Sequence, residues 1–276
     1  MKTNITPGKI VVSALAMLWL AVAGSPFYFM LMSGFKEQFE MFTAGVFALP
    51  KGLYLNNFKE VLTSSFYNYM LNSILVVSIS LVLILMTASF AAYPFSRLKF
   101  KLNRPLFGIV VAAMAVPIHV TLIPLFNLTQ MVKLYDTIWA LIGPYTAFNL
   151  PISVFILTGF MAEIPKELEE SAEIDGCGKF RTFFEIIFPL SKAGLATLAI
   201  YNGVNMWNEF SFALVLTQSV KSRTLPLSIW EYQGQYNSNI PMVMTVLTLC
   251  ALPMIIAFII GQDKLIKGMM AGAVKG

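Results

Sequence analysis

Long apolar runs separated by short polar segments dominate the pattern along this chain. Five stretches contain no Asp, Glu, Lys or Arg, and a sixth, 193–220, contains a single carboxylate. The uncharged stretches are 10–35, 61–96, 105–132, 137–162 and 232–262. A helix needs about 20 apolar residues to cross the hydrocarbon core of a bilayer. The pattern therefore predicts six transmembrane helices, at about 10–33, 69–94, 105–130, 137–161, 191–216 and 241–262.

The composition agrees with a membrane protein. Hydrophobic residues make up 57% of the 276 residues and charged residues 12%, against about 25% charged in soluble domains. The first apolar run resembles a signal peptide, but it continues to Phe35, beyond a usual signal core. We interpret it as an uncleaved span. The prediction is an all-α, polytopic membrane protein with one transmembrane domain, residues 1–276.

The basic residues indicate the orientation, because Lys and Arg concentrate in cytoplasmic loops. With the N-terminus inside, the inner segments are 1–9, 97–104, 163–192 and 263–276, and they hold thirteen of the 19 basic residues. The segment "RLKFKLNR", 97–104, contributes four of these and no acid. We therefore expect both termini to lie in the cytoplasm.

The remaining composition excludes other kinds of protein. Two cysteines, Cys177 and Cys250, make no disulfide framework, and a single histidine rules out the common His-rich zinc sites, so we expect no metal site. The net charge of +5 follows the topology, and no nucleic-acid partner is expected. An intramembrane enzyme would need a nucleophile with a base, or paired acids. The apolar stretches provide neither, so no enzyme is predicted.

One segment breaks the apolar pattern, since seven of the 14 carboxylates lie between residues 163 and 185. Its sequence predicts a helix, a turn and a second, amphipathic helix. Carboxylates crowd the first turns, where the helix dipole favours negative charge, and Gly176 suits a C-terminal cap with positive φ. Ala172 offers a small surface that another backbone can approach. Pro189 is expected to end the second helix just before the fifth span.

Two interpretations of this acidic segment, 163–190, are open from its composition. It is either an amphipathic connector that rests on lipid headgroups or a surface that docks on a protein. An interfacial helix prefers Lys and Arg on its polar face, and the cytoplasmic leaflet usually carries negative lipids. The acidic composition therefore favours a protein partner with a basic groove.

The string "ESAEIDG", 170–176, followed after nine residues by "IIFP", resembles the EAA motif of permease subunits of binding-protein-dependent ABC importers. That motif is Glu-Ala-Ala, three residues, Gly, nine residues, Ile, one residue, Leu-Pro. The residues in register are Glu170, Ala172, Gly176, Ile186 and Pro189, with Ser171 in place of an Ala and Phe188 in place of the Leu. Asp175, "WNEF" at 207–210 and the C-terminal "GMMAGAVKG" are similar to the carbohydrate branch, in particular the second permease of maltose-type systems. The resemblance covers essentially the whole chain.

The resemblance implies the type I ABC importer permease fold, with six transmembrane helices and a short cytoplasmic coupling helix that docks into a cleft of an ATPase. The implied coupling residues are Glu169, Glu170, Ser171, Ala172, Asp175, Gly176, Ile186 and Pro189. Closure of the paired ATPases on ATP then switches the cavity between two permeases from inward-facing to outward-facing. A binding protein outside the cytoplasm delivers the sugar.

The implied partners are a second permease, expected to form a heterodimer with this one, an ABC ATPase dimer, a sugar-binding protein, and the lipid of a bacterial or archaeal inner membrane. The chain contains no G-x-x-x-x-G-K-[ST] motif, and the nearest string, "GCGKF", lacks the first Gly and the hydroxyl residue. We therefore expect the partner ATPase to use ATP and Mg²⁺, and this chain to bind no cofactor.

Glu209 is the charged residue within the predicted fifth span. A carboxylate at mid-bilayer costs about 2.5–3.5 kcal/mol on insertion scales, so Glu209 either lines a polar cavity or lies near the outer end of the span and reaches water. Asn205, Asn208 and Glu209 have the i, i+3, i+4 spacing of one helix face, and amides, a carboxylate and an aromatic ring suit a sugar. The candidate pathway residues are His119, Asn127, Asn202, Asn205, Trp207, Asn208 and Glu209.

His119 lies mid-way along the predicted third span, between Pro117 and Pro124. It either hydrogen-bonds a backbone carbonyl that a proline has freed or contributes to the pathway. The alternative to an ABC permease is a self-sufficient secondary transporter, for which inverted repeats and broken helices around mid-membrane ionisable groups are expected. Neither is clear in the sequence. We therefore predict a transport subunit that forms half of the translocation pathway of an ATP-driven sugar importer.

Overall fold

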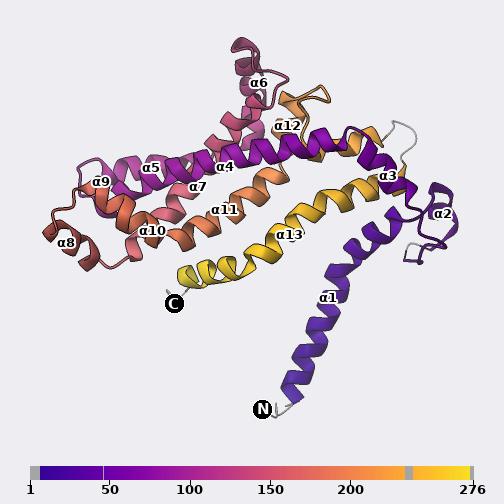
Figure 1. Cartoon of the computed structure of the whole chain (residues 1–276), viewed down its shortest axis with the longest axis horizontal. Coiled ribbons are helices and arrows are strands. Elements are labelled where there is room, and N and C mark those ends of the chain that lie inside the picture. The colour runs from indigo at the N-terminus through magenta and orange to yellow at the C-terminus, as the bar shows by residue number, and fades with distance from the viewer. Residues whose placement is uncertain (1–6, 46, 234–238, 274–276) are drawn as a thin grey trace. The chain divides into compact units, whose positions relative to one another are not determined.

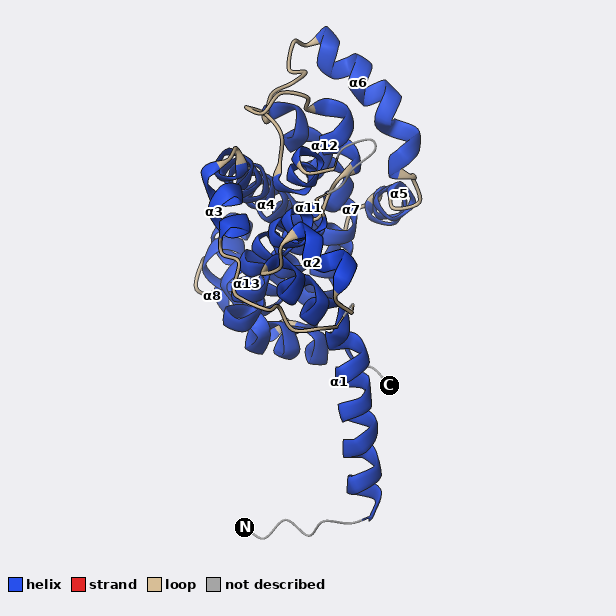
Figure 2. Cartoon of the chain, turned by 90° about the vertical axis from the view of Figure 1, so that its right-hand side faces the viewer, coloured by secondary structure: helices blue, strands red, loops and turns tan. Residues whose placement is uncertain are grey.

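The computed structural model describes residues 7–45, 47–233 and 239–273, and only the backbone of 263–273. Lys2 and Lys275, which enter the orientation prediction, and the last three residues of "GMMAGAVKG" lie outside the described residues. The described part of the chain is helical and contains no strand (Figures 1 and 2). It divides into two compact units, 1–67 with 228–252, and 68–227 with 253–276.

The helices follow the predicted spans closely. α1 (Pro7–Gly34), α4 (Phe66–Arg97), α7 (Trp139–Glu163) and the Ile240–Gln262 part of α13 (Ile240–Ala273) are each long and apolar enough to cross a membrane. Two bent pairs of shorter helices bring the candidate spans to six if each pair is one span. The prediction of an all-α polytopic protein is confirmed.

The expected third span is not one continuous helix. α5 (Asn103–Ala113) is followed by a 3₁₀ turn, η1 (Ile118–Thr121), and by α6 (Leu122–Met131), and the direction changes by 87° between α5 and this second part. The amides of 114–116 donate to carbonyls three residues back, which tightens the end of α5. Pro117, which has no N–H, continues in an extended conformation with ψ 130°.

The expected fifth span is also interrupted. It consists of α11 (Lys192–Trp207) and α12 (Ser211–Leu216), with a break at 208–210. α9 (Lys179–Thr182), a π-helical turn η2 (Phe183–Ile187) and α10 (Phe188–Leu190) precede it, and α11 departs from them by 67°. Pro189 lies within α10, which ends one residue later at Leu190, so the helix ends just before the span as predicted but not at the proline.

In the unit 1–67 plus 228–252, the end of α1 packs closely against α13. A Cβ on Gly34 would lie 3.1 Å from Thr245 Oγ1, so only a glycine permits this approach without a shift. Asn57, in α3 (Asn56–Thr63), donates from Nδ2 to the carbonyls of Gly34 at 2.9 Å and Lys36 at 2.8 Å. These bonds satisfy carbonyls that lack helical partners after α1. The short α2 (Gln38–Thr43) follows.

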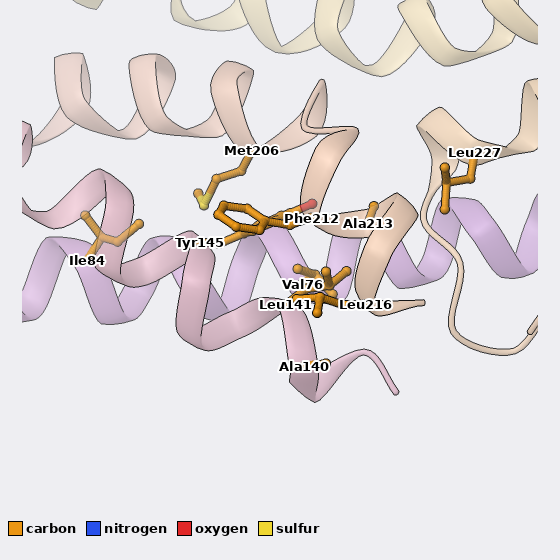
Figure 3. Packing of buried hydrophobic residues seen from close by; sticks show 10 residues of the cluster. All are labelled: Val76, Ile84, Ala140, Leu141, Tyr145, Met206, Phe212, Ala213, Leu216 and Leu227. Carbon is orange, nitrogen blue, oxygen red and sulfur yellow. The ribbon is translucent and has the colours of Figure 1, made fainter. Parts of the chain in front are cut away.

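In the unit 68–227 plus 253–276, two apolar clusters lie along α4 and α7. The first joins them to α11, α12 and the 3₁₀ helix η3 (Leu225–Glu231), and Figure 3 shows its members. The second joins them to η2 and α11, with the rings of Tyr93 and Phe183 5.2 Å apart. α7 and α11 approach closely, because a Cβ on Gly194 would lie 2.8 Å from Phe160 Cγ. Small residues at helix contacts are typical of membrane proteins.

Candidate functional site

The acidic segment folds as a helix and a turn. α8 (Glu167–Ile174) has three carboxylates in its first turn, as predicted from the helix dipole. Gly176 follows the helix with φ +81°, and the amide of Cys177 donates to the carbonyl of Ala172 at 2.8 Å. This is the glycine-ended cap that the sequence predicts.

The outer surface of this segment combines carboxylates with apolar side chains. Ile174 is 87% exposed and Phe180 80% exposed. Among the implied coupling residues, Glu170, Ser171, Asp175 and Gly176 are exposed, Glu169 is partly covered, and Ile186 and Pro189 are partly buried. Ala172 is 5% exposed and covered by this chain itself. The expectation that Ala172 offers an open surface to another backbone is therefore wrong.

Arg97 connects the acidic segment to two spans. Its Nε lies 3.1 Å from Glu169 Oε1, and its Nη2 donates to the carbonyls of Met161 and Ile164. In the sequence, Arg97 stands out only as one of four basic residues of the 97–104 segment. The sequence feature that could have identified it is its position directly after the uncharged stretch 61–96.

A cavity of about 410 Å³ lies between α7, α11 and the break after Trp207. Its polar wall consists of Tyr145, Asn149, Tyr201, Asn205 and Glu209, and its apolar wall of Met114, Ile118, Phe148, Ile152, Met206 and Phe212. Figure 3 shows Tyr145, Met206 and Phe212 in the adjoining apolar cluster. Aromatic rings beside a few convergent polar groups form the usual lining of a small-molecule site.

Glu209 has a structural role as well as a place in this wall. Its carboxylate accepts hydrogen bonds from the Tyr145 hydroxyl at 3.0 Å and from the amides of Phe212 at 2.8 Å and Ala213 at 3.2 Å. The two amides belong to the start of α12, where no helical acceptor exists. The expectation that Asn205, Asn208 and Glu209 share one helix face is wrong, because α11 ends at Trp207. Asn205 and Glu209 nevertheless meet at the cavity.

The other candidate pathway residues do not line this cavity. Asn202 is fully buried and donates to Ser153 Oγ at 2.8 Å, and Trp207 is 7% exposed. Asn208 turns back to the carbonyl of Val204, at 2.9 Å, while Asn127 is exposed. His119 lies exposed in η1, and its imidazole makes no hydrogen bond within the described part of the chain. Of its two interpretations, the bond to a freed backbone carbonyl is therefore not found.

Three polar residues of the cavity wall were missed in the sequence. Tyr145 and Asn149 are four residues apart on α7 and therefore share a face. Tyr201 lies one turn before Asn205 on α11. Polar side chains at i, i+4 spacing within the uncharged fourth span were the signal that could have found the first two.

Asp136, in the turn before α7, is hydrogen-bonded to the segment that follows α12. One carboxylate oxygen of Asp136 accepts hydrogen bonds from the amides of Gln218 and Ser219, both at 2.8 Å, and from the Ser222 hydroxyl. Burial raises the pKa of Asp136, but these hydrogen bonds outweigh it and lower the pKa from 3.8 to about 2. Asn72 Nδ2, on α4, also donates to the carbonyl of Lys221 in this segment, at 2.8 Å.

Comparison with known proteins identifies the family. Residues 84–270 match the family described as "Binding-protein-dependent transport system inner membrane component". The chain belongs to this family. It is therefore a multi-pass inner-membrane transport component, and the predicted resemblance is confirmed. The match spans both bent pairs of helices, α7 and the acidic segment.

Curated relatives extend along nearly the whole chain. A protein named "Putative ABC transporter permease protein ORF2", from Caldicellulosiruptor sp. (strain Rt8B.4), is 56% identical over 94% of each chain. The "Melibiose/raffinose/stachyose import permease protein MelC" of Bacillus subtilis (strain 168) is 31% identical over 100% of both chains. The fold is also that of a solved structure, "Crystal structure of a bacterial ABC transporter involved in the import of the acidic polysaccharide alginate", with a TM-score of 0.81, 20% identity, and coverage of 95% of this chain and 99% of that one.

Proposed function

We propose that this permease moves a sugar or oligosaccharide into the cell as one of two permease subunits of an ATP-driven importer. The observation that carries the substrate class is the relative named for melibiose, raffinose and stachyose, which aligns with the chain from end to end. The mixture of aromatic rings, amides and a carboxylate around the cavity supports the same class, since a sugar offers hydroxyls and an apolar ring face.

In this proposal the cavity is the contribution of the chain to the translocation pathway. The Glu209 carboxylate is oriented by two backbone amides and by Tyr145, so its position is set before a sugar arrives. A carboxylate has about four lone-pair sites, which leaves capacity for a sugar hydroxyl. Asn149 and Asn205 add amide donors and acceptors along the same wall.

The exposed face of α8 is the surface proposed to dock on a cytoplasmic ATPase. Acidic side chains around the exposed Ile174 suit a partly apolar, basic groove. The ATPase pair would bind ATP and Mg²⁺, a second permease would complete the pathway, and an extracytoplasmic binding protein would deliver the sugar. Both chain termini and α8 then lie on the cytoplasmic side, in agreement with the distribution of basic residues.

The experiment is purification of the tagged chain from its own cells in mild detergent, with the bound proteins identified by mass spectrometry. A second permease and an ATPase with a P-loop are expected in near-stoichiometric amounts. The purified complex, with its binding protein in proteoliposomes, should then take up radiolabelled raffinose or a related oligosaccharide only when ATP is supplied. A chain that purifies alone and moves solute without ATP would instead be a secondary transporter.

A further inference from the structure

Arg97 lies where three helices meet. It is the last residue of α4, its Nη2 donates to carbonyls at the end of α7, and its Nε lies 3.1 Å from the carboxylate of Glu169 in the first turn of α8. The side chain of Arg97 is 2% exposed and that of Glu169 is 14% exposed. The pair is therefore largely removed from water.

Each charged group in this arrangement lies beside charge or partial charge of the opposite sign. The carbonyls at the ends of α4 and α7 carry partial negative charge, which a cation stabilises, and the start of α8 carries partial positive charge, which a carboxylate stabilises. A guanidinium is a planar fork of N–H donors that carries a full charge, so its Nη2 can donate to the α7 carbonyls while its Nε side lies at ion-pair distance from Glu169. A lysine ammonium lacks this geometry.

Other attachments of α8 are weaker. Ala172 is the buried residue of the helix. The ion pairs Lys179–Glu173 and Arg181–Glu185 lie within the acidic segment and have side chains about half exposed. Exposed pairs contribute little, because water and salt screen them. The Arg97–Glu169 pair, by contrast, joins α8 to two spans and is shielded from solvent.

We propose that Arg97 is a positioning residue that couples movement of α8 to the ends of α4 and α7. When α8 moves with a docked partner, the buried pair transmits the displacement to both spans instead of letting the turn at 164–166 bend. This inference rests on the proposed function, because it takes the ATPase as the partner of α8.

The test compares Arg97→Gln, Glu169→Gln and the double variant in the reconstituted complex, with the number of sugar molecules imported per ATP hydrolysed as the main readout. Each single variant leaves one buried partner unpaired and should reduce the yield of intact complex. The double variant is neutral at both positions and should recover that yield. Its import per ATP should stay at least about fivefold below wild type, the lower end of coupling between distant sites.

Arg104→Gln is the matched control, because Arg104 is an exposed guanidinium in the same basic segment. It should keep the wild-type ratio. If the double variant also keeps the wild-type ratio, Arg97 has a folding role alone and the proposal is overturned while the proposed function stands. If the wild-type complex shows no ATP-dependent uptake at all, the proposed function is wrong, and this inference, which depends on it, is wrong as well.

Discussion

The Tyr145 hydroxyl donates a hydrogen bond to the Glu209 carboxylate at 3.0 Å, and this contact joins α7 to the break between α11 and α12 at the cavity. Tyr145→Phe removes the donor and leaves the ring in place. A hydrogen bond to a charged group contributes about 1.5–3 kcal/mol, so we expect sugar uptake at subsaturating concentration to fall about tenfold while the complex assembles normally. Tyr67→Phe, at an exposed position, should not change uptake. Equal uptake by both variants would remove Tyr145 from the pathway.

Glu209 is predicted to serve two purposes that different substitutions separate. Glu209→Ala removes the acceptor for the first amides of α12 and should lower stability by about 1–2 kcal/mol, as the loss of a helix cap does. Glu209→Gln keeps one of the two oxygen acceptors and removes the charge, so it should lower the thermal stability in detergent less than Glu209→Ala does, while uptake falls. Normal uptake by Glu209→Gln, for every sugar that wild type imports, would show that Glu209 acts only as the cap of α12.

Replacing Gly176 by any other residue should destabilise the cap of α8. With φ at +81°, a Cβ there meets no neighbour within 4 Å, so the cost is backbone strain alone. Gly176→Ala should destabilise the cap of α8 by about 1–2 kcal/mol and reduce import per ATP. Gly178→Ala is the control, since Gly178 has φ −75° and is equally unobstructed. Hydrogen exchange of the α8 amides would measure the difference, and identical exchange in the two variants would contradict it.

The Asp136 site predicts acid-sensitive ordering of the segment 217–224. Because the pKa of Asp136 falls from 3.8 to about 2 on folding, its contribution is complete above pH 3.8 and is lost as the pH falls towards 2. Amide exchange at Gln218 and Ser219 should be slower in wild type than in Asp136→Asn at pH 6. The difference should be much smaller at pH 2, where about half of the Asp136 carboxylates are protonated in the folded protein. A difference that persists unchanged at pH 2 would contradict the carboxylate as its cause.

The spans could be predicted from the sequence because length and hydropathy alone decide whether a helix can cross a bilayer. The cap at Gly176 was also predictable, since it depends on local backbone chemistry. The two breaks were not predicted. Pro117 marked the first in the sequence, but the break after Trp207 depends on the Glu209 carboxylate, which binds amides at the start of α12.

The contacts that organise the candidate site lie far apart in the sequence. Tyr145 and Glu209 are 64 residues apart, as are Arg97 and Met161. Helix periodicity says which residues share a face of one helix, but it carries no information on which helices pack together. This is why Glu209 was predicted as a pathway residue without its partner, and why Arg97 was counted only as a loop charge.

Site-specific photo-crosslinking tests most directly whether the exposed face of α8 docks on an ATPase. A photoreactive amino acid replaces Ile174, which is 87% exposed, in cells that produce the complete transporter. The same probe at Leu62, which is 55% exposed in α3, is the control. We predict that the probe at 174 crosslinks to a P-loop ATPase and that the probe at 62 does not. Capture of lipid alone at 174, or of the ATPase equally at both positions, would contradict docking of α8 on the ATPase.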